Sequence, residues 1–145
     1  MIGLLQRVSR ASVDIDGETV ARVDAGLLVL VGVRPDDTPA TARRLAERLL
    51  TYRVFADADG RMNLALADTG GGLLLVPQFT LAARTDKGTR ASFTSAAPPD
   101  QARSLFETLA TAARERHADV QTGRFGADMA VSLTNDGPVT FWLET

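Results

Sequence analysis

The sequence predicts an α+β fold in which two amphipathic helices pack on a curled, barrel-like β-sheet with mixed or mostly antiparallel strands. Strand patterns stand before, between and after two helix patterns, without regular alternation, and one central run of residues is apolar throughout. A chain of 145 residues can bury one sizeable core. We therefore expect a single domain over residues 1–145.

The first strands are marked by a turn signal. The tripeptide "DGE" at 16–18 is flanked by the alternating residues Val13, Ile15, Thr19 and Val23. Asp-Gly between such runs predicts a two-residue β-hairpin. The next run, "GLLVLVGV" at 26–33, is typical of a strand buried on both faces, so we expect it at the centre of the sheet.

Two helices are predicted from caps and periodicity. Thr38 before Pro39 is typical of an N-cap and a first helical turn. After Pro39 in the sequence, apolar residues recur at helical spacing: Ala42, Leu45, Ala46, Leu49 and Leu50. The second helix is expected after "PPD" at 98–100, with Ala102, Leu105, Phe106, Leu109 and Ala113 on its apolar face. Arg116 and His117 fall near its C-terminal end, where the helix dipole favours cations.

Two prolines interrupt strand patterns. The pattern of residues 73–82 predicts a strand that carries Pro77, and a long turn-rich connection is expected at 83–99. Residues 119–135 and 138–144 predict two closing strands separated by Gly137-Pro138. Because proline lacks an N–H for the ladder, this pair is either a turn between strands or rigid backbone presented to another molecule.

Composition excludes several kinds of site. Without cysteine there are no disulfides, thiolate nucleophiles or Cys-ligated zinc, which fits a reducing cytoplasm, and no apolar run approaches a membrane span. "DADGRMNLALAD" at 57–68 departs from a calcium loop and predicts a tight turn, and "TGGG" at 69–72 lacks the lysine of a phosphate loop. We expect no metal and no cofactor. His117 is the only histidine and has no evident catalytic partners.

The net charge of −2 means that contact with a nucleic acid needs a local basic patch. Arg84, Lys87 and Arg90 are close together in the long connection, and on charge alone ordinary solvated surface is the favoured explanation for them.

Several segments resemble the D-aminoacyl-tRNA deacylase family, which removes wrongly attached D-amino acids from tRNA. The matching motifs run in the family's order along nearly the whole chain: "QRVSRASV" at 6–13, "GLLVLVGV" at 26–33, "DGRMNL" at 59–64, "QFTL" at 78–81, "SFTSAAPP" at 92–99, "TGRFGADMAVSL" at 122–133 and "NDGPVT" at 135–140.

The resemblance implies a homodimer whose active sites lie at the subunit interface. Gly137-Pro138 of one subunit, with a cis peptide bond in the family, would face the "QFTL" segment of the other. Its two carbonyl oxygens would accept hydrogen bonds from the α-ammonium group of the substrate, and an L side chain would collide with its backbone. Glycine has no side chain to reject, so glycyl-tRNA is an expected substrate beside D-aminoacyl-tRNA. Arg7 matches the family arginine that holds the Gly-Pro loop.

The same resemblance suggests roles around residue 78. Gln78 and the backbone N–H of Phe79 are candidates to bind the ester carbonyl and its oxyanion. Thr80 is either a nucleophile or a shaping residue, with the chemistry then given to the 2′-hydroxyl of the terminal adenosine. Phe125 and Met129 either line a pocket for that adenine or pack in the core.

One position departs from the family pattern. Pro77 stands where the family usually has serine, which removes a hydroxyl and a backbone donor before Gln78. Proline at this place is similar to a related animal deacylase with relaxed chiral selectivity, so chiral strictness is less firmly predicted than activity. Two alternatives stay open: a non-catalytic dimeric tRNA-binding module, and a Thr80-dependent hydrolase of small esters.

Overall fold

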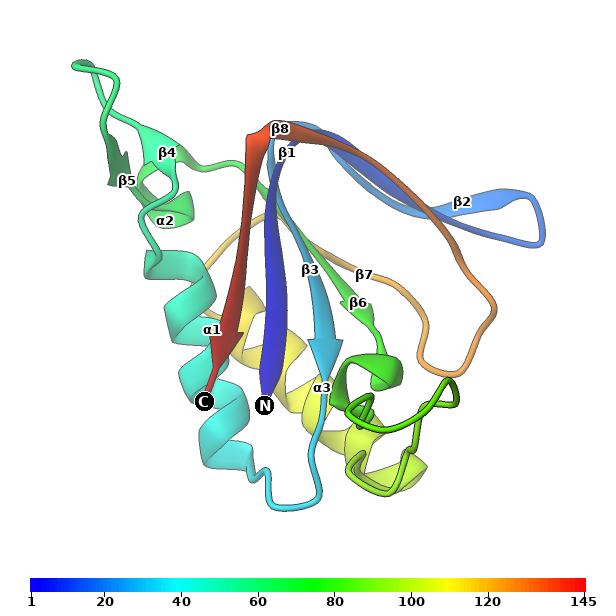
Figure 1. Cartoon of the computed structure of the whole chain (residues 1–145). Coiled ribbons are helices and arrows are strands. Elements are labelled where there is room, and N and C mark those ends of the chain that lie inside the picture. Colours follow the sequence, from blue (N-terminus) through cyan, green and yellow to red (C-terminus); the bar gives the residue numbers. More distant parts are fainter.

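In the computed structural model, which describes residues 1–145, two long helices cover one face of a curved six-stranded sheet (Figure 1). The strand order is β2-β1-β3-β6-β7, and β8 pairs with β1. These elements are β1 (Ile2–Ile15), β2 (Glu18–Val23), β3 (Gly26–Gly32), α1 (Pro39–Thr51), β6 (Gly72–Pro77), α3 (Pro99–Arg114), β7 (Val120–Thr122) and β8 (Ala130–Glu144). Smaller elements are β4 (Phe55–Ala56), β5 (Met62–Leu64), α2 (Leu66–Thr69) and the 3₁₀ helix η1 (Phe79–Ala82). The predicted fold class is confirmed.

The N-terminal strands follow the prediction closely. β1 and β2 form an antiparallel hairpin, and Asp16 and Gly17 at its tip have φ values of 51° and 80°. Two successive positive φ values are typical of a type I′ turn, whose twist matches that of the paired strands. β3 lies between β1 and β6, so the expected central position of residues 26–33 is also confirmed.

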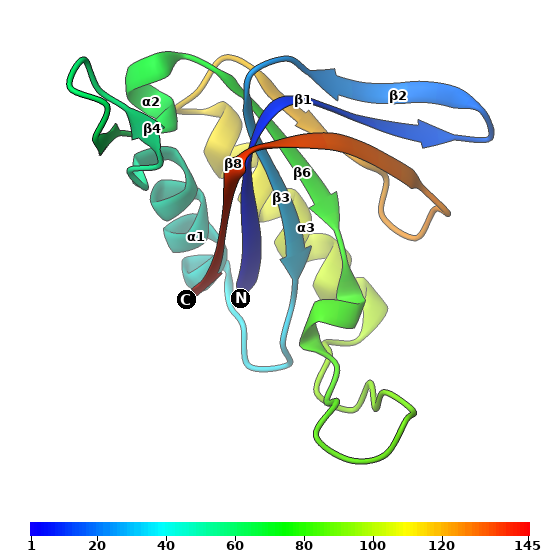
Figure 2. The ribbon, with the colours of Figure 1, turned by 45° about the horizontal axis from the view of Figure 1, so that its top comes forward.

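Strand β1 changes partners along its length. Residues 2–8 pair with β3, residues 11–15 pair with β2, and β8 runs antiparallel along the other edge. The β1–β8 register shifts on both sides of Val8. Because such irregularities bend a strand, the outer parts of β1, β2 and β8 extend away from the helices (Figure 2).

The closing strands differ from the prediction. Residues 119–135 do not form one strand: β7 covers only Val120–Thr122 and pairs parallel to β6, and β8 begins at Ala130. Nor does Gly137-Pro138 separate two strands, since β8 continues through it. Gln6 pairs with Thr140 and Val8 with Asn135, so Arg7 alone faces residues 136–139. Proline is accommodated in β8 because this stretch bulges out of the ladder.

The core lies mainly between the sheet and the helices. Fully buried leucines meet there from both layers, among them Leu45, Leu49, Leu73, Leu75 and Leu109. Helix α1 begins as predicted, with Thr38 and Thr41 each bonded to the other's backbone N–H in a capping box. Helix α3 ends at Arg114, so Arg116 and His117 lie just beyond it.

Residues 57–68 contain the predicted turn and also the strand β5 and the start of helix α2, which were not predicted. The Asp57 carboxylate accepts hydrogen bonds from the backbone N–H of Arg61, from the Asn63 side chain and from the backbone N–H of Asp59, and these bonds lower the pKa of Asp57. These bonds form the turn between β4 and β5, and α2 follows. No helix of the protein combines the length and apolar character that a bilayer crossing requires.

Candidate active site

The site is built at the end of β6. Pro77 is the last residue of this strand and pairs with Val31 of β3, while on the other side β7 reaches only as far as Leu75. A proline is tolerated because no strand needs its missing N–H on that side. The next residue, Gln78, donates its backbone N–H to the carbonyl oxygen of Val31 at 2.7 Å. The carboxyl ends of parallel strands therefore fix the segment that carries the predicted active-site residues.

A cavity of about 480 Å³ opens beside this strand end. Its wall combines five of the predicted site residues: Pro77, Gln78, Phe79, Phe125 and Met129. The fold thus brings together two segments nearly fifty positions apart in the sequence. The guanidinium of Arg103 lies over the Phe125 ring, with Cζ 5.0 Å from its centroid. The cavity is largely apolar with a few polar groups at its edge, as is common for small-molecule sites.

The 3₁₀ helix η1 sets the polar edge of the cavity. The Gln78 side-chain amide donates to the Thr80 hydroxyl. Phe79 and Thr80 open η1, so η1 itself contains no acceptor for their backbone N–H groups. Phe79 is 56% exposed, and its ring lies 5.2 Å from that of Phe93, centroid to centroid.

Thr80 lacks the partner that a nucleophile requires. Its side chain is outside the cavity lining and bonds to Gln78. The only histidine, His117, places its Nε2 at 2.6 Å from the carbonyl oxygen of Gly71. No general base is therefore paired with the Thr80 hydroxyl.

Gly137 and Pro138 are exposed and do not line the cavity of their own chain. Their peptide bond is cis. The Arg7 side chain, only 16% exposed, holds the preceding residue: its Nε donates to the Asp136 carbonyl oxygen at 3.1 Å, and its Nη1 donates to the Val54 carbonyl oxygen at 2.6 Å. Arg7 thus ties the bulge of β8 to the segment that follows helix α1.

Three contributors were not singled out from the sequence. Asn135 spans the bulge, accepting from the backbone N–H of Val139 at 3.1 Å and donating to the Thr140 hydroxyl at 2.8 Å. An asparagine two residues before Gly-Pro is a usable signal for such a side-chain bond to nearby backbone. Phe93 and Arg103 had no local signal, because they reach Phe79 and Phe125 only through the tertiary fold.

The chain is similar to known proteins along its whole length. It is 63% identical to the D-aminoacyl-tRNA deacylase of Janthinobacterium sp. (strain Marseille), covering 99% of this chain and 97% of that one. It is 62% identical to the protein of the same name from Pseudomonas fluorescens, with both chains covered completely.

Two solved structures share the fold. The structure titled "c-Myc DNA Unwinding Element Binding Protein" matches with a TM-score of 0.95 and 34% identity, over 100% of this chain and 99% of that one. "Structural Analysis of a probable eukaryotic D-amino acid tRNA deacylase" describes a chain that matches with a TM-score of 0.87 over 99% of this chain and 98% of its own. At 17% identity, the second likeness shows the fold alone.

The family model described as D-Tyr-tRNA(Tyr) deacylase matches residues 4–144, a range that contains the cavity at the end of β6, the arginine-held bulge of β8 and both helices. By this match and by its full-length relatives, the chain belongs to the D-Tyr-tRNA(Tyr) deacylase family.

Proposed function

We propose that the protein hydrolyses the ester bond of D-aminoacyl-tRNA, releasing the D-amino acid and free tRNA. The observation that carries this function is the cavity of about 480 Å³ that joins Gln78 and Phe79 to Phe125 and Met129, in a chain of this family. Its size falls within the usual range of about 300–1,000 Å³ for small-ligand sites. In this assignment the apolar wall takes the terminal adenosine, and the ester lies against Gln78 and Phe79.

The second half of the site comes from a partner subunit. Gly137 and Pro138 are exposed, fixed by Arg7 and Asn135, and absent from the cavity of their own chain. In a two-fold dimer, each subunit lends this pair to the other's cavity. Its carbonyl oxygens accept from the substrate's α-ammonium group, and its backbone leaves no room for an L side chain. Glycyl esters are also accepted, because glycine has no side chain that could collide with this backbone.

The chemistry is assigned to positioning rather than to a protein nucleophile. Water adds to the ester carbonyl, the bond to the ribose oxygen breaks, and that oxygen takes up a proton. The Gln78 amide and the Phe79 N–H stabilise the oxyanion, and the adenosine 2′-hydroxyl assists the proton transfer. The bond from Gln78 to the Thr80 hydroxyl supports a shaping role for Thr80.

Matched D-Tyr-tRNA and L-Tyr-tRNA test the function directly. We expect release of D-tyrosine with the L ester left intact, and release of glycine from glycyl-tRNA. Binding of tRNA without ester loss supports the non-catalytic module instead, and equal loss of the D and L esters contradicts the chiral mechanism.

Two changes test the chemistry. Thr80→Ala is expected to keep most of the turnover, whereas a tRNA that ends in 2′-deoxyadenosine, acylated at the 3′ position, is expected to lose it. Loss of turnover in Thr80→Ala, together with retained turnover of the 2′-deoxyadenosine substrate, would establish Thr80 as the nucleophile.

A further inference from the structure

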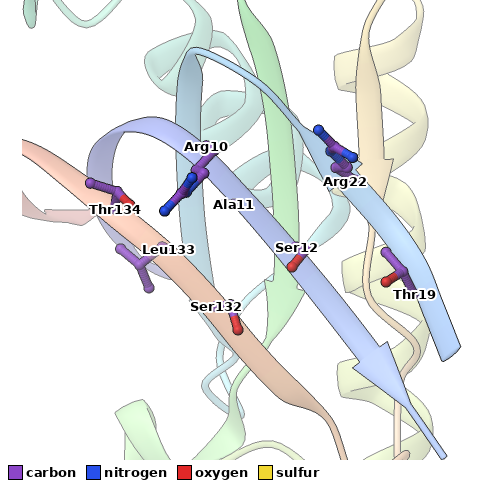
Figure 3. A pocket seen from close by; sticks show the side chains of 8 residues that line it. All are labelled: Arg10, Ala11, Ser12, Thr19, Arg22, Ser132, Leu133 and Thr134. Atoms are coloured by element: carbon purple, nitrogen blue, oxygen red, sulfur yellow. The ribbon is translucent and has the colours of Figure 1, made fainter. Parts of the chain in front are cut away.

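A second cavity lies on the outer face of β2, β1 and β8 (Figure 3). Its volume is about 390 Å³, and the lining includes two arginines and four hydroxyl side chains: Arg10, Arg22, Ser12, Thr19, Ser132 and Thr134. None of these residues belongs to the cavity at the end of β6.

The strand register explains why these side chains gather. Ser12 of β1 pairs with Arg22 on β2 and with Ser132 on β8, and Arg10 pairs with Thr134. Directly paired residues project to the same side of a sheet, as do residues two apart along a strand. The two guanidiniums and three of the hydroxyls therefore share one face, with Ser12 at its middle (Figure 3).

The charges on this face are open to an external anion. Arg10 forms no ion pair, and the only one that Arg22 makes is to Asp24 at 3.6 Å, between side chains that are 72% and 87% exposed. Such an exposed pair holds the arginine weakly. The Thr19 hydroxyl already donates to the nearby Asp14 carboxylate, so the hydroxyls of Ser12, Ser132 and Thr134 are the ones that remain able to donate to a phosphate. Two guanidiniums with hydroxyl donors are the groups that bind phosphate oxygens in nucleic-acid complexes.

This cavity is separated from the proposed adenosine pocket by the thickness of one strand. Val131 lines the pocket at the end of β6, and its neighbour Ser132 lines the arginine cavity. Successive residues of a strand point to opposite faces, and β8 is an edge strand. A nucleotide chain whose 3′ end enters the proposed adenosine pocket reaches the arginine cavity by passing around the edge of β8.

We propose that Arg10 and Arg22, with the surrounding hydroxyls, bind a backbone phosphate of the tRNA acceptor end. This inference rests on the proposed function and adds the place where the tRNA backbone is held. The net charge of −2 makes such a local site necessary, because the protein as a whole does not attract a polyanion.

The test compares two substrates and two double variants. The substrates are D-Tyr-tRNA and 3′-O-D-tyrosyl-adenosine, which keeps the ester and the nucleoside but has no phosphate. Arg10→Gln with Arg22→Gln removes both charges of the cavity. Arg43→Gln with Arg44→Gln is the matched control, since it removes two exposed charges from α1. All four positions are exposed, so folding is expected to persist and is checked by thermal melting.

We expect the Arg10/Arg22 variant to lose about tenfold or more in kcat/KM for D-Tyr-tRNA and to keep its activity on the adenosine ester. The slope of log affinity for uncharged tRNA against log salt concentration should fall by about one, because one phosphate contact is lost. The Arg43/Arg44 control should change neither quantity.

An unchanged salt slope, or equal losses on both substrates, overturns the phosphate site. If the wild-type protein cleaves neither ester, the proposed function fails, and the salt slope with uncharged tRNA still decides whether the arginine cavity binds phosphate.

Discussion

The two faces of the sheet are built in opposite ways. On the helix-covered face, 24 buried residues form one continuous cluster, whereas the open face has a cluster of only nine. Large apolar side chains outside this core are exposed, with Phe79 at 56% and Trp142 at 48%. Burial of apolar area is the main source of stability, so the covered face holds the molecule together.

The candidate chemistry lies outside the helix-covered core. The cavity at the end of β6 lies at the edge of the sheet, where Pro99 and Ala102 of α3 join its lining. The arginine cavity lies on the outer parts of β1, β2 and β8, on the opposite side of these strands from the nine-residue cluster. Changes on the covered face should therefore act on stability, and changes on the open side should act on activity.

The largest effect is expected from the covered face. Leu49 is completely buried in the larger cluster, and Leu49→Ala should lower the free energy of unfolding by about 2–5 kcal/mol, because it leaves a cavity. Urea denaturation measures this loss. Leu133→Ala is the control on the open side, where 37% of the side chain is exposed, and it should cost less than about 1 kcal/mol. Similar losses for the two variants would contradict the division between the faces.

The next effect concerns the bulge of β8. Gly137 has a φ of 129°, and an added Cβ would lie 2.8 Å from Val139 Cγ2 and 3.1 Å from Arg7 Nη2. Gly137→Ala should introduce about 1–3 kcal/mol of strain, displace the bulge and reduce kcat/KM for D-Tyr-tRNA by about 10- to 100-fold.

Gly60→Ala is the control for Gly137→Ala, because it replaces a glycine of positive φ in an ordinary turn. Gly60 also has a positive φ of 76°, but nothing lies within 4 Å of its added Cβ, in the β4–β5 turn. The Gly60→Ala variant should be less stable than the wild type but equally active on D-Tyr-tRNA. Full activity of the Gly137 variant would argue against the Gly-Pro element.

A smaller effect is expected at Arg7. Lysine keeps the charge but lacks the planar fork that reaches the carbonyl oxygens of Asp136 and Val54 together. Arg7→Lys should cost about 1 kcal/mol through the lost hydrogen bond and lower kcat/KM for the D ester by up to about tenfold. Kinetics with D-Tyr-tRNA measures the change, and Arg43→Lys on α1 is the neutral control. Equal kinetics for both variants would leave Arg7 without a positioning role.

The smallest effect is expected at the rim between the faces. The Arg34 guanidinium donates to the Glu144 carboxylate at 2.8 Å, and this bond lowers the pKa of Glu144. Because the folded pKa lies below the unfolded one, the stabilisation is present above the unfolded pKa and is lost as pH falls through the folded pKa. Both side chains are more than a third exposed, so the contribution should stay below about 1 kcal/mol. Unfolding at a series of acidic pH values should show a shallower decline for Glu144→Gln than for the wild type.

Much of the fold was predictable because its signals are local. Asp16-Gly17 set the first hairpin, Thr38-Pro39 set the start of α1, and the apolar run at 26–33 indicated the central strand. The closing strands were predicted less well. The sequence of residues 119–135 is typical of one continuous strand, but only Val120–Thr122 pair with β6. No local pattern predicts where the partner strand ends.

The sequence by itself determined the family, the helix-covered core and the residue types at the candidate site, since periodicity, caps and motifs are properties of neighbouring positions. Only the tertiary structure decided that residues 77–79 and 125–129 enclose one cavity, that Arg7 holds the bulge of β8, and that Arg10 and Arg22 share a face. These relations join residues that are distant in the chain. They depend on strand order and register, which are set by packing of the whole sheet.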